Sequence, residues 1–138
     1  MNITEQLIEL VYEHAGVKKE EIKPESFIEE DFGCTGDDAW ELMEEIQKKF
    51  NVDLNEFEFS LHFGPEAGSY VAKNYGYYPV SVKHLIEVAE DKKWKLPPRN
   101  EANYEKHKSS KRKWLVTKLL FLLCFILFII YNNSQICE

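Results

Sequence analysis

The chain has 138 residues, of which 24 are acidic and 17 basic, so its formal net charge is −7. The charge is unevenly distributed, because residues 1–101 hold 22 acidic and 11 basic side chains while residues 102–118 hold one and six. Nucleic-acid binding needs clustered positive charge, so the acidic part excludes nucleic acid as its partner. It favours a protein partner with a basic surface. The three cysteines are scattered and form neither a disulfide framework nor a CxxC metal site.

The first predicted element is an amphipathic helix over residues 3–15, followed by Gly16 as a helix stop. Its apolar residues recur at helical spacing: Ile3, Leu7, Leu10 and Val11. Residues 17–30 then form a loop whose apolar side chains lie too far apart to make an element of their own. We expect these side chains to pack into the core at intervals: Val17, Ile22, Phe27 and Ile28.

A second helix is predicted over residues 37–51, where one apolar stripe follows the helical period. The stripe consists of Ala39, Leu42, Met43, Ile46 and Phe50. Acidic residues occupy the first turn and lysines the last turn, which complements the helix dipole. Trp40 lies outside the stripe, so we expect it to be partly exposed.

Residues 55–78 are rich in aromatic residues and glycine and predict a loop insertion with a short helical turn or strand-like piece. The insertion is interpreted as a satellite core, and a ligand groove is the alternative. Ser81 is then a predicted N-cap for a last helix that ends near Lys93. The predicted fold is therefore all-α, a small three- to four-helix bundle over residues 1–94.

Residues 95–113 predict a polar and basic linker that is partly extended. Residues 114–131 read WLVTKLLFLLCFILFIIY, and 13 of these 18 are Leu, Ile, Val or Phe. A helix of this length spans roughly 27 Å, close to the hydrocarbon core of a bilayer. Basic residues before it place the N-terminal domain in the cytoplasm by the positive-inside rule. The sequence therefore predicts a single-pass protein of the inner membrane, with a short tail at residues 132–138.

The first 94 residues resemble an acyl carrier protein. GVKKEEIKPESFIEEDFG at residues 16–33 resembles the carriers' Gly-Val, acidic loop, Phe and Asp-Leu-Gly. CTGDDAWELMEEIQKKF at residues 34–50 continues in register with their Ala-Asp-Ser-Leu and second helix. SVKHLIEVAEDKKW at residues 81–94 resembles their last helix. The resemblance implies a second helix that docks on basic patches of partner enzymes.

The carriers' serine, which takes the phosphopantetheine arm, aligns with Gly36 in this chain. Thr35 and Asp37 replace its neighbours. Glycine has no nucleophile, so the departure implies that no such cofactor is attached by the usual route. GCTGDDAWEL at residues 33–42, followed by FxFxxxFGPE at 57–66, is similar to the uncharacterised enterobacterial family called domain of unknown function 1493.

The predicted partner-binding residues are the acidic side chains of the second helix and its tryptophan: Asp37, Asp38, Trp40, Glu41, Glu44 and Glu45. An ordinary solvated face is the alternative interpretation. No catalytic motif is visible. The four histidines lack ligand spacing, so no metal site is predicted.

We therefore predict a non-catalytic, membrane-anchored, acyl-carrier-like interaction module. It presents residues 37–51 to a cytoplasmic or membrane protein. Two alternatives remain open. One is a true acyl or peptidyl carrier that is modified at Thr35 or Cys34 and serves lipid synthesis at the membrane. The other is a small regulatory or immunity-type protein on the same fold.

Overall fold

The computed structural model describes residues 2–64 and 75–136, and only the backbone at positions 103, 106–108, 110–112 and 126–136. It contains the helices α1 (Ile3–Ala15), α2 (Gly36–Phe50), α3 (Phe59–His62), α4 (Val82–Asp91) and α5 (Glu101–Ile136), with a 3₁₀ turn at Lys19–Glu21. The chain divides into two units, residues 1–100 and 101–138. Two isolated bridges are the only β pairing in the described residues, so the predicted all-α class is confirmed.

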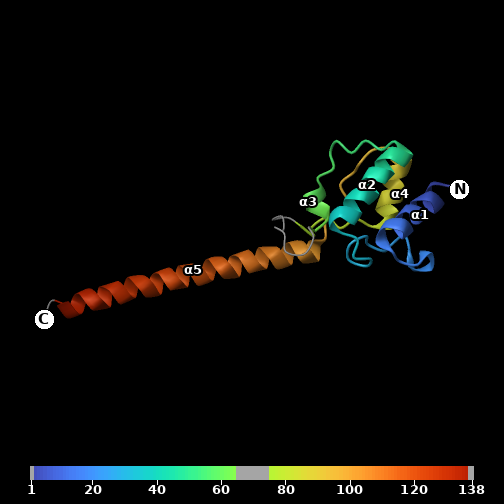
Figure 1. Cartoon of the computed structure of the whole chain (residues 1–138). Coiled ribbons are helices and arrows are strands. Elements are labelled where there is room, and N and C mark those ends of the chain that lie inside the picture. The colour runs from blue at the N-terminus through green and yellow to red at the C-terminus, as the bar shows by residue number, and fades with distance from the viewer. Residues whose placement is uncertain (1, 65–74, 137–138) are drawn as a thin grey trace. The chain divides into compact units, whose positions relative to one another are not determined.

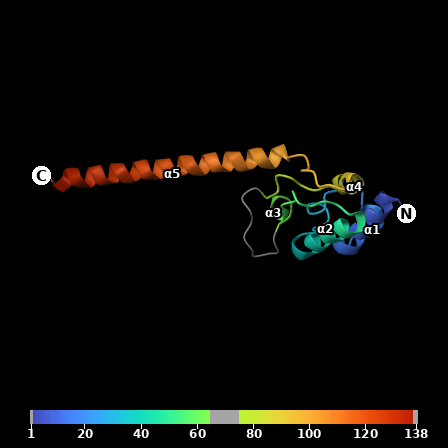
Figure 2. The same cartoon turned by 90° about the horizontal axis from the view of Figure 1, so that it is seen from above.

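Helices α1, α2 and α4 pack against one another in pairs and form the bundle of the first unit (Figures 1 and 2). Each contributes one buried stripe to a single core, which includes Leu7, Leu10, Val11, Leu42, Ile46, Leu85 and Val88. Two polar caps fix where helices begin. Asn2 and Glu5 form a reciprocal capping box at α1, which was not predicted. The Ser81 side chain accepts a hydrogen bond from the His84 N–H at α4, as predicted.

The loop between α1 and α2 contributes some of its predicted residues to the core but not all. Ile22 and Ile28 are buried, with exposed fractions of 6% and 0%. Phe27 is 37% exposed, so the prediction that it packs into the core was wrong. Phe27 forms an isolated β-bridge with Ser81, and adjacent side chains in extended backbone point to opposite sides. Burying Ile28 therefore turns Phe27 outward.

The described part of the aromatic insertion packs onto the core of the bundle, so the prediction of a separate satellite core was wrong: Phe63 belongs to that core, and Phe57 and Phe59 pack against it. Phe57 meets the ring of Trp94 at 4.7 Å between centroids and stacks on His62 at 5.4 Å. Phe63 is 2% exposed. Helix α3 is the short helical turn that the sequence predicts. Residues 65–74 of the predicted insertion lie outside the described residues.

Trp94 belongs to the same core although it lies beyond the end of α4. The helix ends at Asp91 because Lys92 adopts a left-handed conformation, with φ of 54°. The next residues pair with the segment after α2 through a bridge between Asp53 and Lys93. Trp94 is therefore only 2% exposed.

The second unit consists of α5, which begins at Glu101. Residues 101–113 are therefore helical, and the prediction of a partly extended linker was wrong for them. Their glutamate, alanine, lysine and arginine residues are strong helix formers, which outweighs the lack of an apolar stripe. Within the described residues, no helix is long and apolar enough to cross a membrane. The predicted transmembrane helix gains no support there, and the side chains of its residues 126–131 are outside the description.

Candidate functional site

At the start of α2, a backbone carbonyl from the aromatic insertion accepts two hydrogen bonds. Gly36, which stands where carriers have their serine, is buried and has a φ of +56°. Its N–H donates to the carbonyl oxygen of Gly64 at 3.1 Å. The hydroxyl of Thr35 donates to the same oxygen at 2.6 Å. One acceptor therefore binds both Gly36, at the position of the carriers' serine, and Thr35, one of the two alternative attachment residues.

Gly64 is in turn fixed by Glu29, from the loop before α2. The Glu29 carboxylate accepts the Gly64 N–H at 3.1 and 3.2 Å and the hydroxyl of Tyr75 at 2.6 Å. A Cβ atom on Gly64 would lie 2.8 Å from Oε1 of Glu29, so any larger residue would force this carboxylate to shift. We call these five residues the Gly64 latch: Glu29, Thr35, Gly36, Gly64 and Tyr75.

The two nucleophiles near Gly36 are a buried thiol, that of Cys34, and the partly buried hydroxyl of Thr35, which already donates a hydrogen bond. The side chain of Cys34 is 2% exposed, and burial raises the pKa of its thiol to about 11. Thiolate, not thiol, is the reactive form. The hydroxyl of Thr35 is engaged in the latch. Thr35 is also the N-cap residue of α2, but its side chain accepts no hydrogen bond from the helix.

The six predicted partner-binding residues all project from the solvent side of α2. Asp37, Asp38, Glu41 and Glu45 are exposed. Trp40 is 50% exposed, as predicted. Its indole N–H donates to the Glu44 carboxylate at 3.0 Å. This bond, with the Lys48 ammonium 3.3 Å away, lowers the pKa of Glu44.

These residues are divided between two flanks of the exposed face of α2. Asp38 and Glu45, seven residues apart, share the flank next to α1, where Glu45 approaches His14 at 3.5 Å. Trp40 and Glu44, four residues apart, share the other flank. The exposed face of α2 therefore has an acidic flank toward α1 and a mixed flank with an indole at its edge.

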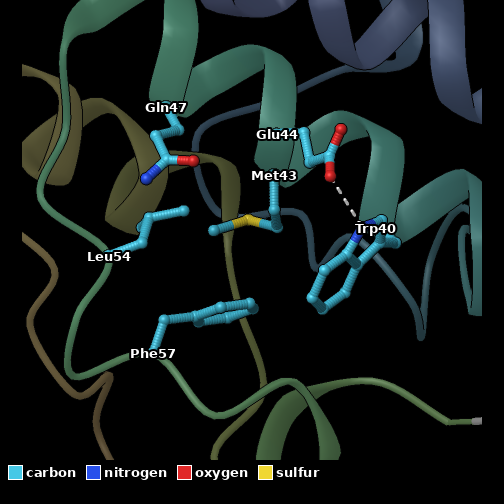
Figure 3. Close-up of a pocket in the computed structure, with 6 residues that line it drawn as sticks. All are labelled: Trp40, Met43, Glu44, Gln47, Leu54 and Phe57. Atoms are coloured by element: carbon cyan, nitrogen blue, oxygen red, sulfur yellow. Dashed lines mark hydrogen bonds between the residues drawn. The ribbon is translucent and has the colours of Figure 1, made fainter.

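A pocket lies beside the mixed flank (Figure 3). Its volume is about 180 Å³, and its walls come from α2 and from the segment after it. Buried Met43 lies between the Trp40 indole on one side and Leu54 and Phe57 on the other (Figure 3). The position of this pocket could not be predicted, because Leu54 and Phe57 follow no period in the sequence that would bring them to α2.

Two buried histidines, His62 and His84, contact the ring of Trp94. His62 donates from Nδ1 to the Tyr78 carbonyl and His84 donates from Nε2 to the Lys95 carbonyl, both at 2.8 Å. Carbonyl oxygens only accept, which fixes the tautomer of each neutral ring. Burial lowers the pKa of both rings. Within the described residues, no group of three or more His, Cys, Asp or Glu side chains is arranged to hold a metal ion.

Comparison with known proteins gives one family and a relative. Residues 1–96 match the family described as "Protein of unknown function (DUF1493)". An acyl carrier protein of Nitratidesulfovibrio vulgaris (strain DSM 19637 / Miyazaki F) is 29% identical over 56 residues, which cover 41% of this chain and 74% of that protein. No solved structure is detectably similar to the chain. The resemblance predicted from the sequence is confirmed.

Proposed function

Because the chain belongs to the DUF1493 family, whose function is unknown, we propose a role from the geometry of α2. The protein is a non-catalytic interaction module that carries no acyl or peptidyl cargo. It presents the exposed face of α2 to a cytoplasmic or membrane protein with a basic surface.

The observation that carries this proposal is the contrast between the start of α2 and its exposed face. At the start, the Gly64 latch covers Gly36, and Cys34 is buried. Attachment of an arm would need an accessible hydroxyl or thiol there. This argues against the alternative of a carrier modified at Thr35 or Cys34.

The exposed face, by contrast, keeps the features that suit docking. Asp37, Asp38, Glu41 and Glu45 are exposed, on a region of residues 1–101 whose charges sum to −11. Complementary charge speeds encounter and rejects wrong partners, while a half-exposed aromatic supplies contact area at low entropic cost. The half-exposed Trp40 adds that aromatic area.

Site-specific photocrosslinking in cells tests the proposal. A photoreactive residue at Glu41 on α2 should capture a discrete protein, and the same residue at exposed Glu87 on α4 should not. Charge reversal with Asp37→Lys should remove the Glu41 adduct. If Glu41 captures nothing across growth conditions, or if both positions capture the same proteins, docking through α2 is wrong.

We also propose that residues 114–131 anchor the protein in the inner membrane, with residues 1–100 on the cytoplasmic side. Helix α5 spans Glu101–Ile136, and its apolar residues from Leu115 to Phe125 are more than half exposed. An apolar surface that large is unusual for a helix in water. Of the two flanks of the segment, only the N-terminal one carries lysine and arginine, which the positive-inside rule assigns to the cytoplasm.

Membrane fractionation tests the anchor. The full-length protein should stay in the membrane pellet after a high-salt wash, because an apolar helix, unlike a charged surface, is not released by screening. A matched variant that ends after residue 113 should leave the pellet. Recovery of the full-length protein in the wash would refute the anchor and leave the docking proposal intact.

A further inference from the structure

We propose that the pocket beside α2 receives a single leucine or phenylalanine side chain from a basic segment of the partner protein. This inference rests on the proposed function and specifies it. In this arrangement Trp40 forms a wall of the recipient pocket.

The size and lining of the pocket define the occupant. An apolar cavity of roughly 150 Å³ holds one benzene molecule, and this pocket measures about 180 Å³. It therefore accommodates one aromatic ring or one branched aliphatic side chain. Met43, Leu54 and Phe57 supply apolar surface to the pocket, and methionine adapts to irregular shapes.

Internal contacts hold the walls in place before any partner arrives. The indole of Trp40 lies 5.4 Å from the ring of Phe59 between centroids, and its N–H is bonded to Glu44. Phe57 is packed against Trp94 and His62. A pocket held open in this way lowers the entropic cost of binding.

Acidic residues near the pocket favour a partner segment in which basic residues flank the inserted apolar side chain. Glu44 lines the pocket and Glu41 and Asp37 are exposed along the same helix. The Lys48 ammonium forms an exposed i,i+4 pair with Glu44. Such pairs contribute little to stability, so an arginine or lysine of the partner can take the place of Lys48 at the carboxylate.

A peptide titration on the full-length protein in phosphatidylcholine nanodiscs tests the inference. The probe is a lysine and alanine peptide of about 14 residues, long enough to be partly helical, with one central phenylalanine. One matched peptide replaces the phenylalanine with alanine, and another replaces every lysine with glutamate. Fluorine NMR of 5-fluorotryptophan resolves Trp40, Trp94 and Trp114, with assignments from single Trp→Phe variants.

The phenylalanine peptide should shift the Trp40 signal and leave that of Trp94 in place. Loss of the ring should weaken binding at least about tenfold, since a buried aromatic anchor dominates such contacts. Replacing every lysine of the peptide with glutamate should abolish binding. In the protein, Glu44→Gln should weaken binding about two- to fivefold, as for an exposed charge pair.

A filling variant and its matched control locate the site. Gln47 lines the pocket and is exposed, so Gln47→Phe should fill it and weaken binding at least about tenfold. Lys49, exposed on the same helix but absent from the lining, provides the control. Lys49→Phe adds the same ring and makes the surface more acidic, so it should keep full affinity.

Several results would overturn the inference. They are absence of peptide binding, equal binding of the phenylalanine and alanine peptides, and full affinity in Gln47→Phe. A Trp40 shift produced by decanoic acid or by protein concentration alone, but not by the peptide, would assign the pocket to a lipid or to a second copy. Crosslinking from Glu41 separates the two proposals: if it persists when the peptide fails, docking stands and the pocket assignment falls.

Discussion

Replacing Gly64 with alanine should open the latch at the start of α2. The added Cβ would lie 2.8 Å from Oε1 of Glu29 and 3.2 Å from the ring and hydroxyl of Tyr75. The carboxylate must withdraw, and with it go its hydrogen bonds to the Gly64 N–H and the Tyr75 hydroxyl. Gly64 is not among the residues with positive φ, so the cost comes from this contact and not from the backbone conformation of alanine.

The size of the effect follows from the bonds that are lost. Hydrogen bonds to a charged group contribute about 1.5–3 kcal/mol each, and these are only partly buried, so the variant should lose about 2 kcal/mol of unfolding free energy. For a domain of this size that lowers the melting temperature by about 8–16 °C. Thermal unfolding followed by tryptophan fluorescence measures the shift.

A double-mutant cycle isolates the contact between Gly64 and Glu29. In a Glu29→Ala background the methyl group meets no carboxylate, so Gly64→Ala should cost at least about 1 kcal/mol less than in the native chain. An equal cost in the two backgrounds, or an unchanged melting temperature in the single variant, would refute the latch.

Three further outcomes are expected. The ring protons of His62 and His84 should titrate in NMR with midpoints below the usual 6.5, because burial lowers the pKa of each ring. The free energy of unfolding should therefore fall as the pH drops below about 6.5, where the unfolded chain takes up protons first. A midpoint above 6.5 for either ring would contradict this. At pH 8, Cys34 should react with iodoacetamide more than about a hundredfold slower in the native than in the denatured protein. The reason is that its thiol is buried and the pKa of the thiol is raised to about 11. Similar rates in the two states would contradict its burial. Gly36→Ala should lower the unfolding free energy by about 1–2 kcal/mol in urea, because L side chains disfavour its φ of +56°, and a neutral result would contradict that conformation.

The helices could be predicted from the sequence because their signals are local. The stripe of α2 predicted residues 37–51, and the helix spans Gly36–Phe50. The Ser81 cap was likewise predicted. Burial in the loop was predicted less well, since isolated apolar residues do not indicate which neighbour faces inward. Ile28 is buried and Phe27 is not.

The latch and the pocket depend on contacts between distant segments, and no period in the sequence encodes them. Gly64 meets Glu29 and Gly36 across 35 and 28 positions. The pattern FxFxxxFGPE marked the neighbourhood of Gly64 as distinctive, but it did not indicate what the glycine contacts. Trp94 looked like the end of the last helix and is instead part of the buried core.

The central claim is that this carrier-like domain recognises a partner without carrying cargo. Its most direct test is the intact mass of the full-length protein after co-expression with a phosphopantetheinyl transferase, with a genuine acyl carrier protein in the same cells as the positive control. We predict that the control gains the mass of the arm and that this chain keeps its unmodified mass. A gain of that mass by this chain, located at Thr35 or Cys34, would contradict the account.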